Sequence, residues 1–400
     1  MTRPLYYEDS SITEFRAEVI SCEKAMDQQF PNKGKKEFYQ VVLDQTAFFP
    51  EGGGQSPDVG TLEGQAVIDV QEIDGVIYHA LYNPLQVGRM VTGRIDWTER
   101  FIKMQQHSGE HIVSGLVNQR LGYDNVGFRL GTEAVTMDFN GVITKEQLQE
   151  IEYLANQGVI RNIPIQISYP SKEKLKDLTY RSKIEIEGQV RIITIEGYDV
   201  CACCAPHVKT TGEIGLIKLT DIQNHRGGVR ITMVCGFRAL YEFRAKEESV
   251  RKISVLLSAK EGQVAEAVER LKEENQMLKS SLQKKQNQII GYMLQDLPKG
   301  TKLKCVFESS LSGDGLRELV NQMVQKGTRI GAAFVGTNED GYRYIIGSKC
   351  MDVRPIAKEL NSRFDGRGGG KPEMVQGSLK GSQEDIQRRI EELVDLFPIE

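Results

Sequence analysis

The spacing of apolar residues predicts strands in the first part of the chain and a helix after it. Up to about residue 90, apolar runs such as Phe38–Leu43 and 67–70 end at glycine, proline or aspartate, which is typical of strands. From Trp97 onward the apolar positions instead follow a helical period, at Phe101, Met104, Ile112 and Leu116. We therefore expect a β-rich region followed by a long helix.

Extended segments return after this helix and enclose a cysteine-rich stretch. Residues 127–140, 162–169, 190–195 and 229–235 form short runs with the character of strands. The cysteine-rich stretch follows the run at 190–195, so we expect it just beyond a strand.

Residues 268–289 show the pattern of a helical seam, with alternating spacings of three and four. The positions are Val268, Leu271, Asn275, Leu278, Leu282, Lys285 and Ile289. A polar residue such as Asn275 can fix register or the number of partners. Ser258 and Glu261 predict a capping box at the start of this helix. Self-association and a helical hairpin packed on its own chain both explain the seam.

A small α/β domain is predicted beyond Pro298-Lys-Gly300. Its pattern indicates strands at 302–308, 329–335 and 342–347, helices at 314–325, 353–363 and 382–396, and a glycine-rich loop at 366–371. The chain as a whole is thus expected to be α+β.

Three of the five histidines lie in two pairs of candidate metal ligands. His107 and His111 are four residues apart on the predicted helix and face one side of it, and Cys203 and His207 have the same spacing. A solvated helix face would explain the histidine pair alone, but not the matching second pair. Because thiolate and imidazole together are typical zinc ligands, we expect one Zn²⁺ ion per chain.

Composition narrows the class of protein. Four hundred residues, 40% hydrophobic and 26% charged, predict two or three soluble domains. The chain has seven cysteines, of which Cys201, Cys203 and Cys204 lie close together, and they form no spaced disulfide framework. This predicts reduced thiols and a cytoplasmic location. No segment is suited to a membrane. A net charge of −4 argues against a protein that coats nucleic acid by bulk charge, so a nucleic-acid partner would be recognised through shape and specific contacts.

Two glycine-rich segments are candidate functional loops. In 44–55, the run Gly52, Gly53 and Gly54 permits positive φ and close backbone approach, which favours a loop folded over something rather than a plain hairpin turn. In 366–371, Arg367 and Lys371 flank glycines whose N–H groups could cradle a phosphate. A tight turn with solvated charges explains the second segment equally well.

These segments, in this order, resemble the stand-alone alanyl-tRNA editing proteins called AlaX, relatives of the editing and C-terminal parts of alanyl-tRNA synthetase. The resemblance rests on 43–55 (LDQTAFFPEGGGQ), the two histidines of HSGEH, 203–215 (CCAPHVKTTGEIG) and 366–377 (GRGGGKPEMVQG). It spans essentially the whole chain. The helical seam and the last motif look like the long form of the family.

The resemblance implies a fold of four parts. They are a glycine-rich β-barrel (1–90), a zinc-bearing α/β editing domain (91–240), a helical arm (241–298) and a C-terminal α/β domain that also occurs with DHH phosphoesterases (299–400). It implies a hydrolase that removes serine, with glycine as a second candidate, from mischarged tRNA(Ala) in trans. The partners implied are the acceptor end and elbow of tRNA(Ala), and a second copy of the chain bound through the arm and last domain.

The resemblance also implies roles for individual residues. The zinc ligands would be His107, His111, Cys203 and His207. Thr46 aligns with the threonine whose hydroxyl recognises the serine side chain, and Gln55 lines the same pocket with the three glycines. Such a pocket can reject a substrate that lacks the hydroxyl by about 10⁴-fold or more. Glu110, between the histidines, is either a general base or a solvated charge.

The chain departs from the common family pattern at two places. Cys-Gly-Gly-Thr-His is replaced by Cys203-Cys-Ala-Pro-His207, with Cys201 just upstream. Cys201 and Cys204 are thus two extra thiols near the ligands, although spacing favours Cys203. Asp365 stands where a glycine often precedes the last motif.

Basic residues near both motifs are candidates for contacts with tRNA. Those near the metal motif would reach the acceptor end, and those of the last motif would contact backbone phosphates. They are Lys209, Arg226 and Arg230 in the first group, and Arg367 and Lys371 in the second. The alternative to an editing enzyme is a non-catalytic tRNA-binding module in which zinc only stabilises the fold.

Overall fold

The computed structural model describes residues 2–25, 37–182, 189–309, 311 and 313–396. Contacts divide the chain into two compact units, Met1–Arg251 and Lys252–Glu400, which are described separately. The chain is of the α+β class, as predicted. Among the described residues, none of the helices combines the length and apolar character that crossing a membrane requires.

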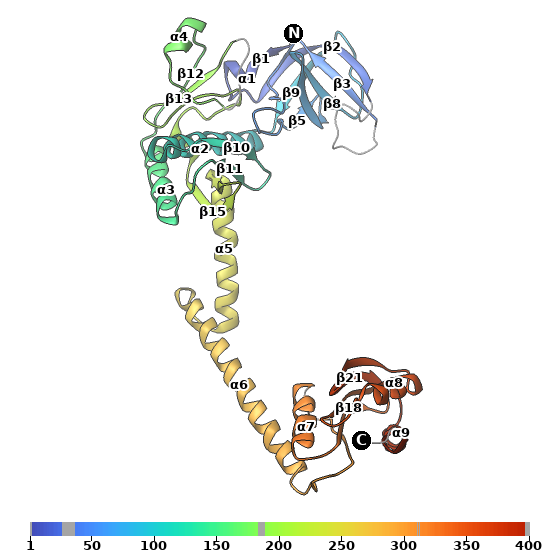
Figure 1. Ribbon diagram of the computed structural model, residues 1–400. Coiled ribbons are helices and arrows are strands. Elements are labelled where there is room, and N and C mark those ends of the chain that lie inside the picture. Colours follow the sequence, from blue (N-terminus) through green and yellow to red (C-terminus); the bar gives the residue numbers. More distant parts are fainter. Residues whose placement is uncertain (1, 26–36, 183–188, 310, 312, 397–400) are drawn as a thin grey trace. The chain divides into compact units, whose positions relative to one another are not determined.

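A nearly closed barrel forms the first part of unit 1 (Figure 1). Its strands follow the order β6-β5-β9-β2-β3-β8-β7, and β6 and β7 are consecutive in the chain, so the two edges of the sheet meet. The bounds are β2 (Glu14–Ala25), β3 (Phe38–Leu43), β5 (Gly60–Leu62), β6 (Gln65–Val67), β7 (Asp69–Ile73), β8 (Val76–Leu81) and β9 (Met90–Ile95). The strand at 38–43 is confirmed, whereas the one at 67–70 is split at Ile68.

A short parallel pair, β1 (Arg3–Pro4) and β4 (Gln45–Thr46), and helix α1 (Leu5–Glu8) complete this part. Apolar side chains that alternate along the strands fill its interior. Among them are Ala17, Val19, Val41, Leu43 and Leu81, and Phe48 joins them from the segment after β4. The glycine-rich motif leaves this interior directly after β4.

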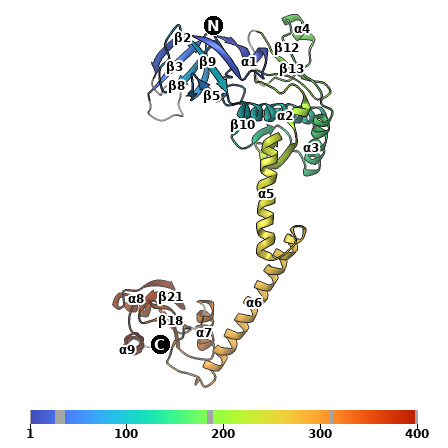
Figure 2. The ribbon, with the colours of Figure 1, turned by 180° about the vertical axis from the view of Figure 1, so that it is seen from behind.

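The rest of unit 1 surrounds the long helix α2 (Trp97–Leu121), which lies between two sheets (Figures 1 and 2). One sheet has the order β10-β11-β16-β15 and the other β12-β13-β14. The bounds are β10 (Asn125–Leu130), β11 (Val135–Phe139), β12 (Ile165–Ser168), β13 (Ile192–Ile195), β14 (Asp199–Ala202), β15 (Ile217–His225) and β16 (Gly228–Cys235). The accompanying helices are α3 (Lys145–Ile160), α4 (Lys172–Asp177) and the 3₁₀ helix η1 (Thr211–Ile214).

Helix α2 begins and ends at capping residues. The Asp96 carboxylate accepts the N–H of Glu99 at 3.1 Å, and Gly122 follows the last turn with φ +71°. Every residue from Ile102 to Val117 is buried, so the polar side chains of the middle turns must find partners inside the protein.

Two further helices follow, α5 (Gly236–Leu257) and α6 (Val264–Met293), with the 3₁₀ turn η2 (Glu261–Gln263) between them. The predicted capping box is wrong, because Ser258 follows the last residue of α5 with φ +50° and does not cap α6. The apolar seam lies on α6, but its side chains are exposed; Leu278, for example, is 70% exposed.

Unit 2 ends in a five-stranded sheet with the order β17-β18-β19-β21-β20. Its elements are β17 (Leu303–Phe307), α7 (Gly313–Gln325), β18 (Ile330–Thr337), β19 (Gly341–Ser348), α8 (Arg354–Arg363), β20 (Arg367–Lys371), β21 (Met374–Leu379) and α9 (Gln383–Leu396). Even-numbered side chains of β19 pack with α8 and α9, whereas Ile345 packs with α7, so these helices cover opposite faces (Figure 1).

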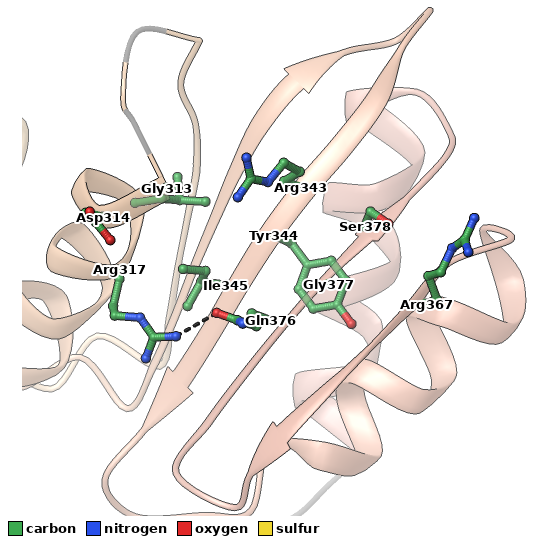
Figure 3. A pocket seen from close by; sticks show the side chains of 11 residues that line it. Gly313, Asp314, Arg317, Arg343, Tyr344, Ile345, Arg367, Gln376, Gly377 and Ser378 are labelled. Carbon is green, nitrogen blue, oxygen red and sulfur yellow. Dashed lines mark hydrogen bonds between the residues drawn. The ribbon is translucent and has the colours of Figure 1, made fainter. Parts of the chain in front are cut away.

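The prediction of a loop at 366–371 is wrong, because residues 367–371 form the edge strand β20, on which Figure 3 shows Arg367. This strand pairs with β21, which was not predicted from the sequence. Before β20, Asp365 has φ +46°, a conformation that favours glycine. This explains why glycine is common at the position in the family that the motif resembles.

Candidate metal centre

The four predicted ligands come together in unit 1. His107 and His111 lie on one face of α2, and Cys203 and His207 lie in the loop that follows β14. One ligand atom from each lies within 4.8 Å of all the others. The Cys203 sulfur is 3.5 Å from Nε2 of His107 and 3.4 Å from Nε2 of His207.

Two of the imidazoles are held by their Nδ1 atoms. Nδ1 of His107 lies 3.0 Å from Oε1, the side-chain amide oxygen of Gln55. Nδ1 of His207 lies 3.1 Å from the Ser108 hydroxyl. The amide oxygen can only accept, so His107 donates from Nδ1 and keeps the lone pair of Nε2 free. Gln55 belongs to the glycine-rich motif, so this motif orients a ligand directly.

The third imidazole, that of His111, is held by a buried carboxylate. Nδ1 of His111 lies 2.7 Å from Asp199, which also binds the Arg181 guanidinium through both oxygens at 2.8 and 2.7 Å. Nε2 of His111 is buried and has no hydrogen-bond partner among the described residues. A buried ring nitrogen that has no hydrogen-bond partner is expected where a metal ion binds.

The donor set fits zinc. Tetrahedral bonds of about 2.3 Å to sulfur and about 2.0 Å to nitrogen place these two ligand atoms about 3.5 Å apart. The measured separations of 3.5 and 3.4 Å agree. A carbonyl or carboxylate oxygen behind the ring, as at His107 and His111, is also usual for imidazoles that bind metal ions.

Electrostatics favour a thiolate at Cys203. Burial alone would raise the pKa of this thiol, but the neighbouring imidazoles, chiefly that of His107, outweigh it and hold the pKa well below its ordinary value. Burial lowers the pKa of His207 to about 3, so this imidazole is neutral. Burial alone would also lower the pKa of His111. The hydrogen bond to Asp199 outweighs burial, so the pKa of His111 lies well above its ordinary value.

The two other thiols differ from Cys203. Cys204 is exposed, and its sulfur faces the glycine-rich motif. Cys201 forms a second group of candidate ligands with His111 and Asp199, but Arg181 already occupies both carboxylate oxygens. The geometry therefore supports Cys203 as the sulfur ligand.

The glycine run packs closely beside the centre. A Cβ atom on Gly54 would lie 2.7 Å from the Phe128 ring, and one on Gly53 would lie 3.3 Å from the Cys204 sulfur. The Phe128 ring centroid is 4.9 Å from that of His107. Gly53 and Gly54 also have positive φ, so conformation favours glycine at both positions and space requires it at Gly54.

Thr46 lies inside the barrel and is fully buried. His79 lies 3.1 Å from the Val41 carbonyl through Nδ1 and 2.8 Å from the Thr46 hydroxyl through Nε2. A carbonyl only accepts, so Nδ1 carries the proton and the hydroxyl donates to Nε2. The Phe48 N–H donates to the Thr46 oxygen at 3.1 Å, which leaves that oxygen one further lone pair.

Glu110 is 2% exposed, so its expected alternative role as a solvated charge is wrong. One carboxylate oxygen accepts hydrogen bonds from Ser114 and Asn125, both at 2.7 Å. These partners differ from those of the metal ligands.

The basic residues of unit 1 differ in how far they are already paired. Arg230 makes two contacts with Asp138, at 2.6 and 2.7 Å, and Lys209 lies 3.4 Å from Asp9. Arg226 is exposed at the two-residue turn between β15 and β16. Arg129, which sequence reasoning missed, lines a hollow of about 460 Å³ beside Phe128.

Sequence reasoning also missed a buried arginine that joins the glycine-rich motif to α2. Arg100 forms an ion pair with Asp58 and donates to the Ala47 carbonyl at 2.5 Å and to Ser10 at 3.0 Å. Its position on the same helix, about two turns before His107, was the only signal in the sequence. The pair fixes the motif against the helix that carries two ligands.

Comparison with known proteins identifies the class. Residues 2–99 match the family described as tRNA synthetases class II (A), residues 190–252 the threonyl and alanyl tRNA synthetase second additional domain, and residues 300–397 the DHHA1 domain. The chain is thus related to aminoacyl-tRNA synthetases.

Two individual relatives are both alanine–tRNA ligases. The alanine–tRNA ligase of Pyrococcus abyssi is 30% identical over 99% of this chain and 44% of its own length. That of Pyrococcus furiosus is 31% identical over 95% of this chain and 42% of its own length. The chain belongs among the alanyl-tRNA synthetase-related proteins and spans less than half the length of these relatives.

A solved structure also matches part of the chain. The crystal structure of the C-Ala domain from Aquifex aeolicus alanyl-tRNA synthetase covers 24% of this chain and 92% of its own, at 17% identity and a TM-score of 0.21.

Proposed function

We propose that the chain is an aminoacyl-tRNA deacylase of the AlaX type, which removes serine from mischarged tRNA(Ala) in trans at a zinc-containing site. Glycine is the second candidate amino acid. The observation that carries the proposal is the convergence of His107, His111, Cys203 and His207 in a chain related to alanyl-tRNA synthetases.

The reaction is the hydrolysis of an ester. Water adds its oxygen to the carbonyl carbon, the bond from that carbon to the ribose oxygen of the tRNA breaks, and the ribose oxygen takes up a proton. A bound zinc ion would activate the water or polarise the carbonyl. Gln55, Ser108 and Asp199 hold the three imidazoles in position.

Two features support a role of the glycine-rich motif in substrate binding. Nε2 of Gln55 is buried without a hydrogen-bond partner among the described residues, so a donor is free beside the centre. The lone pair left on Thr46 would accept the proton of a serine hydroxyl, which alanine lacks. Because Thr46 is fully buried, this contact needs the motif to open.

A second function is favoured by the number of protein ligands. Four side chains fill a tetrahedral zinc shell, as in structural sites. The chain would then be a non-catalytic module that binds tRNA. Glu110, the proposed general base of the enzyme, would in this case be only a buried polar residue.

The proposed partner in either case is tRNA(Ala). Lys209, Arg226 and Arg230 would contact the acceptor end, and Arg367 and Lys371 the backbone phosphates. A second copy of the chain is the proposed partner of the exposed seam on α6, and the cytoplasm the proposed location.

The deciding experiment measures deacylation of Ser-tRNA(Ala) and Ala-tRNA(Ala) by the purified chain, with zinc content determined on the same preparation. Rapid loss of serine, slow loss of alanine and about one zinc per chain support the enzyme. Zinc without turnover supports the binding module. Equal loss of both amino acids contradicts the proposed selectivity. Glu110→Gln in the same assay tests the general base, because it keeps the size of the side chain but removes its basicity.

A further inference from the structure

A buried arginine, Arg191, stands directly before β13 in unit 1 and is 7% exposed. One of its guanidinium nitrogens, Nη1, donates to the carbonyl oxygens of Cys203 at 2.8 Å and of Ala205 at 2.9 Å. Both carbonyls belong to residues 203–207, which we call the ligand loop because it begins and ends at a candidate metal ligand. Arg191 therefore holds the backbone between these two ligands.

The ligand loop contains no helix or strand. Its backbone lacks the regular hydrogen bonds that fix a strand, and Pro206 has no N–H to donate. Side chains from other segments bind the loop instead. Arg191 binds its first and third carbonyls, and the Ser10 hydroxyl donates to its last carbonyl, that of His207, at 3.0 Å. Alternate carbonyls from one ligand to the next are thus held, two of the three by Arg191.

The backbones of Arg191 and Cys203 are also joined. The Cys203 N–H donates to the Arg191 carbonyl at 3.1 Å, one pair beyond the ladder of β13 and β14 that ends at Ile192 and Ala202. Arg191 therefore binds Cys203 through both its N–H and its carbonyl. Because sulfur and nitrogen ligands of one tetrahedral zinc ion lie about 3.5 Å apart, a shift of this backbone by about 1 Å would open the shell.

The ligand loop lies where the barrel meets the rest of unit 1. Ala205 is fully buried in the apolar core of the barrel, whereas Cys203 packs against this core and against the core around α2. The guanidinium carbon of Arg191 lies 5.3 Å from the ring centroid of Tyr7, which belongs to α1 of the barrel part. Arg191 thus connects both parts of unit 1 to the loop that carries two ligands.

The charge of Arg191 is not balanced by a carboxylate. Arg100 and Arg181 each form an ion pair, whereas Arg191 has no ion-pair partner within the described part of the chain. Its Nε is buried and has no hydrogen-bond partner among the described residues. Because burial of an unpaired charge costs stability, an arginine in this state is expected at a functional site rather than in a core that serves only the fold.

We infer that Arg191 is a positioning residue of the metal centre. Its guanidinium sets the course of the ligand loop and so brings the Cys203 sulfur and the His207 imidazole to one ion. The inference rests on the zinc site of the proposed function, and it holds for the deacylase and for the tRNA-binding module alike.

Metal binding to the full chain tests the inference with two measurements. Competition with a chromogenic chelator gives the zinc affinity, and the absorption spectrum of the Co²⁺-substituted protein reports the geometry of the shell and the bond to sulfur. In Arg191→Met, we expect zinc affinity to fall by about 10- to 100-fold and the cobalt bands to lose the pattern of a tetrahedral site. In Arg191→Lys, the ammonium group can donate to the carbonyls from a different position, so we expect an intermediate affinity and a smaller shift of the bands.

Leu62→Ala is the control for a general loss of stability. Leu62 is fully buried on β5, which pairs with β6 and β9 rather than with a segment that carries a ligand. Its truncation should lower the resistance of unit 1 to urea, because it leaves a cavity in the barrel. Zinc affinity and the cobalt spectrum should stay as in the wild type.

Wild-type affinity and cobalt bands in Arg191→Met would overturn the inference, and so would an equal loss of affinity in Leu62→Ala. If Arg191→Met does not fold, Arg191→Lys decides, because wild-type affinity and bands in that variant contradict a positioning role. A wild type that binds no zinc contradicts the metal centre, and with it both this inference and the proposed function. A wild type that binds zinc but does not release serine contradicts only the enzyme, and the variants still test Arg191.

Discussion

The Asp199 carboxylate lies between the imidazole of His111 and the guanidinium of Arg181, with contacts of 2.7 Å to each. All three groups come from different segments of unit 1, and Asp199 and His111 are buried. Arg181 keeps the carboxylate ionised, and the pKa of Asp199 is lowered, mainly by its bonds to His111 and Arg181, which outweigh burial. The carboxylate in turn fixes the direction of the ligand nitrogen.

Asp199→Asn should therefore reduce zinc affinity by about 10- to 100-fold, the usual effect of losing a carboxylate behind a ligating imidazole. Competition with a chromogenic chelator measures this without reference to activity. Asp177→Asn, at an exposed position on α4, should have no effect. An unchanged affinity in Asp199→Asn would mean that His111 is not a ligand.

Cys203→Ser should abolish stoichiometric zinc, while Cys204→Ser should retain about one ion per chain. The reason is that the sulfur of Cys203 lies among the imidazoles, whereas Cys204 faces the glycine run. Elemental analysis of purified protein gives the comparison. Retention of zinc in Cys203→Ser with its loss in Cys201→Ser would move the site to the second group of ligands.

Burial lowers the pKa of His79 to about 4, against about 6.5 in an unfolded chain. As the pH falls from 6.5 to 4, the unfolded state binds a proton that the folded state does not. This histidine should thus cost about 3 kcal/mol of stability across that range, with the full stability present above pH 6.5. Urea unfolding at both ends of the range should show a smaller acid loss in His79→Gln than in the wild type. Equal losses would contradict the neutral, buried imidazole.

Asp58→Asn should destabilise unit 1 by about 3–5 kcal/mol, because it leaves the buried guanidinium of Arg100 without its counter-charge. Denaturant titration followed by circular dichroism measures the change. The exposed pair of Arg3 and Glu8 provides the comparison, and Glu8→Gln should cost at most about 1 kcal/mol. Similar effects of the two substitutions would show that Asp58 and Arg100 do not form a buried pair.

Thr46→Val should slow single-turnover deacylation of Ser-tRNA(Ala) more than it disturbs folding. The substitution removes the acceptor for a serine hydroxyl and leaves His79 unpaired, which should cost about 1–3 kcal/mol of stability. Gly-tRNA(Ala) is the internal control, because glycine has no hydroxyl and should be released at an unchanged rate. Equal rates for serine in the variant and the wild type would remove Thr46 from the substrate pocket.

The sequence predicted elements well where side chains report the local conformation. Helix α2 could be placed because its apolar residues follow one period between Asp96 and Gly122. Strand β20 could not, because three glycines show no alternation of side chains and look like a loop. Ser258 failed as a cap because α6 begins only after Gln263, while Ser258 itself follows the last turn of α5 in the left-handed conformation.

The four candidate ligands, which the structure brings together, were named from the sequence, but the groups that orient them were named only in part. The spacing of four residues is enough to predict that His107 and His111 lie on the same face of a helix. Asp199 and Ser108 show their roles only when β14 and α2 pack together. The bond between Thr46 and His79 depends on how β4 and β8 lie across the barrel, which no local pattern encodes.

Strand β20 has a consequence for solubility. It is the outer strand of its sheet, it is exposed along its whole length, and its middle has no side chains to obstruct a second strand. Such an edge is a template for pairing with another chain, and flanking charges are a usual protection against it. Arg367 and Lys371 stand at its two ends, so their mutual repulsion between copies should keep two such edges apart, and removal of both charges should favour aggregation of the folded protein.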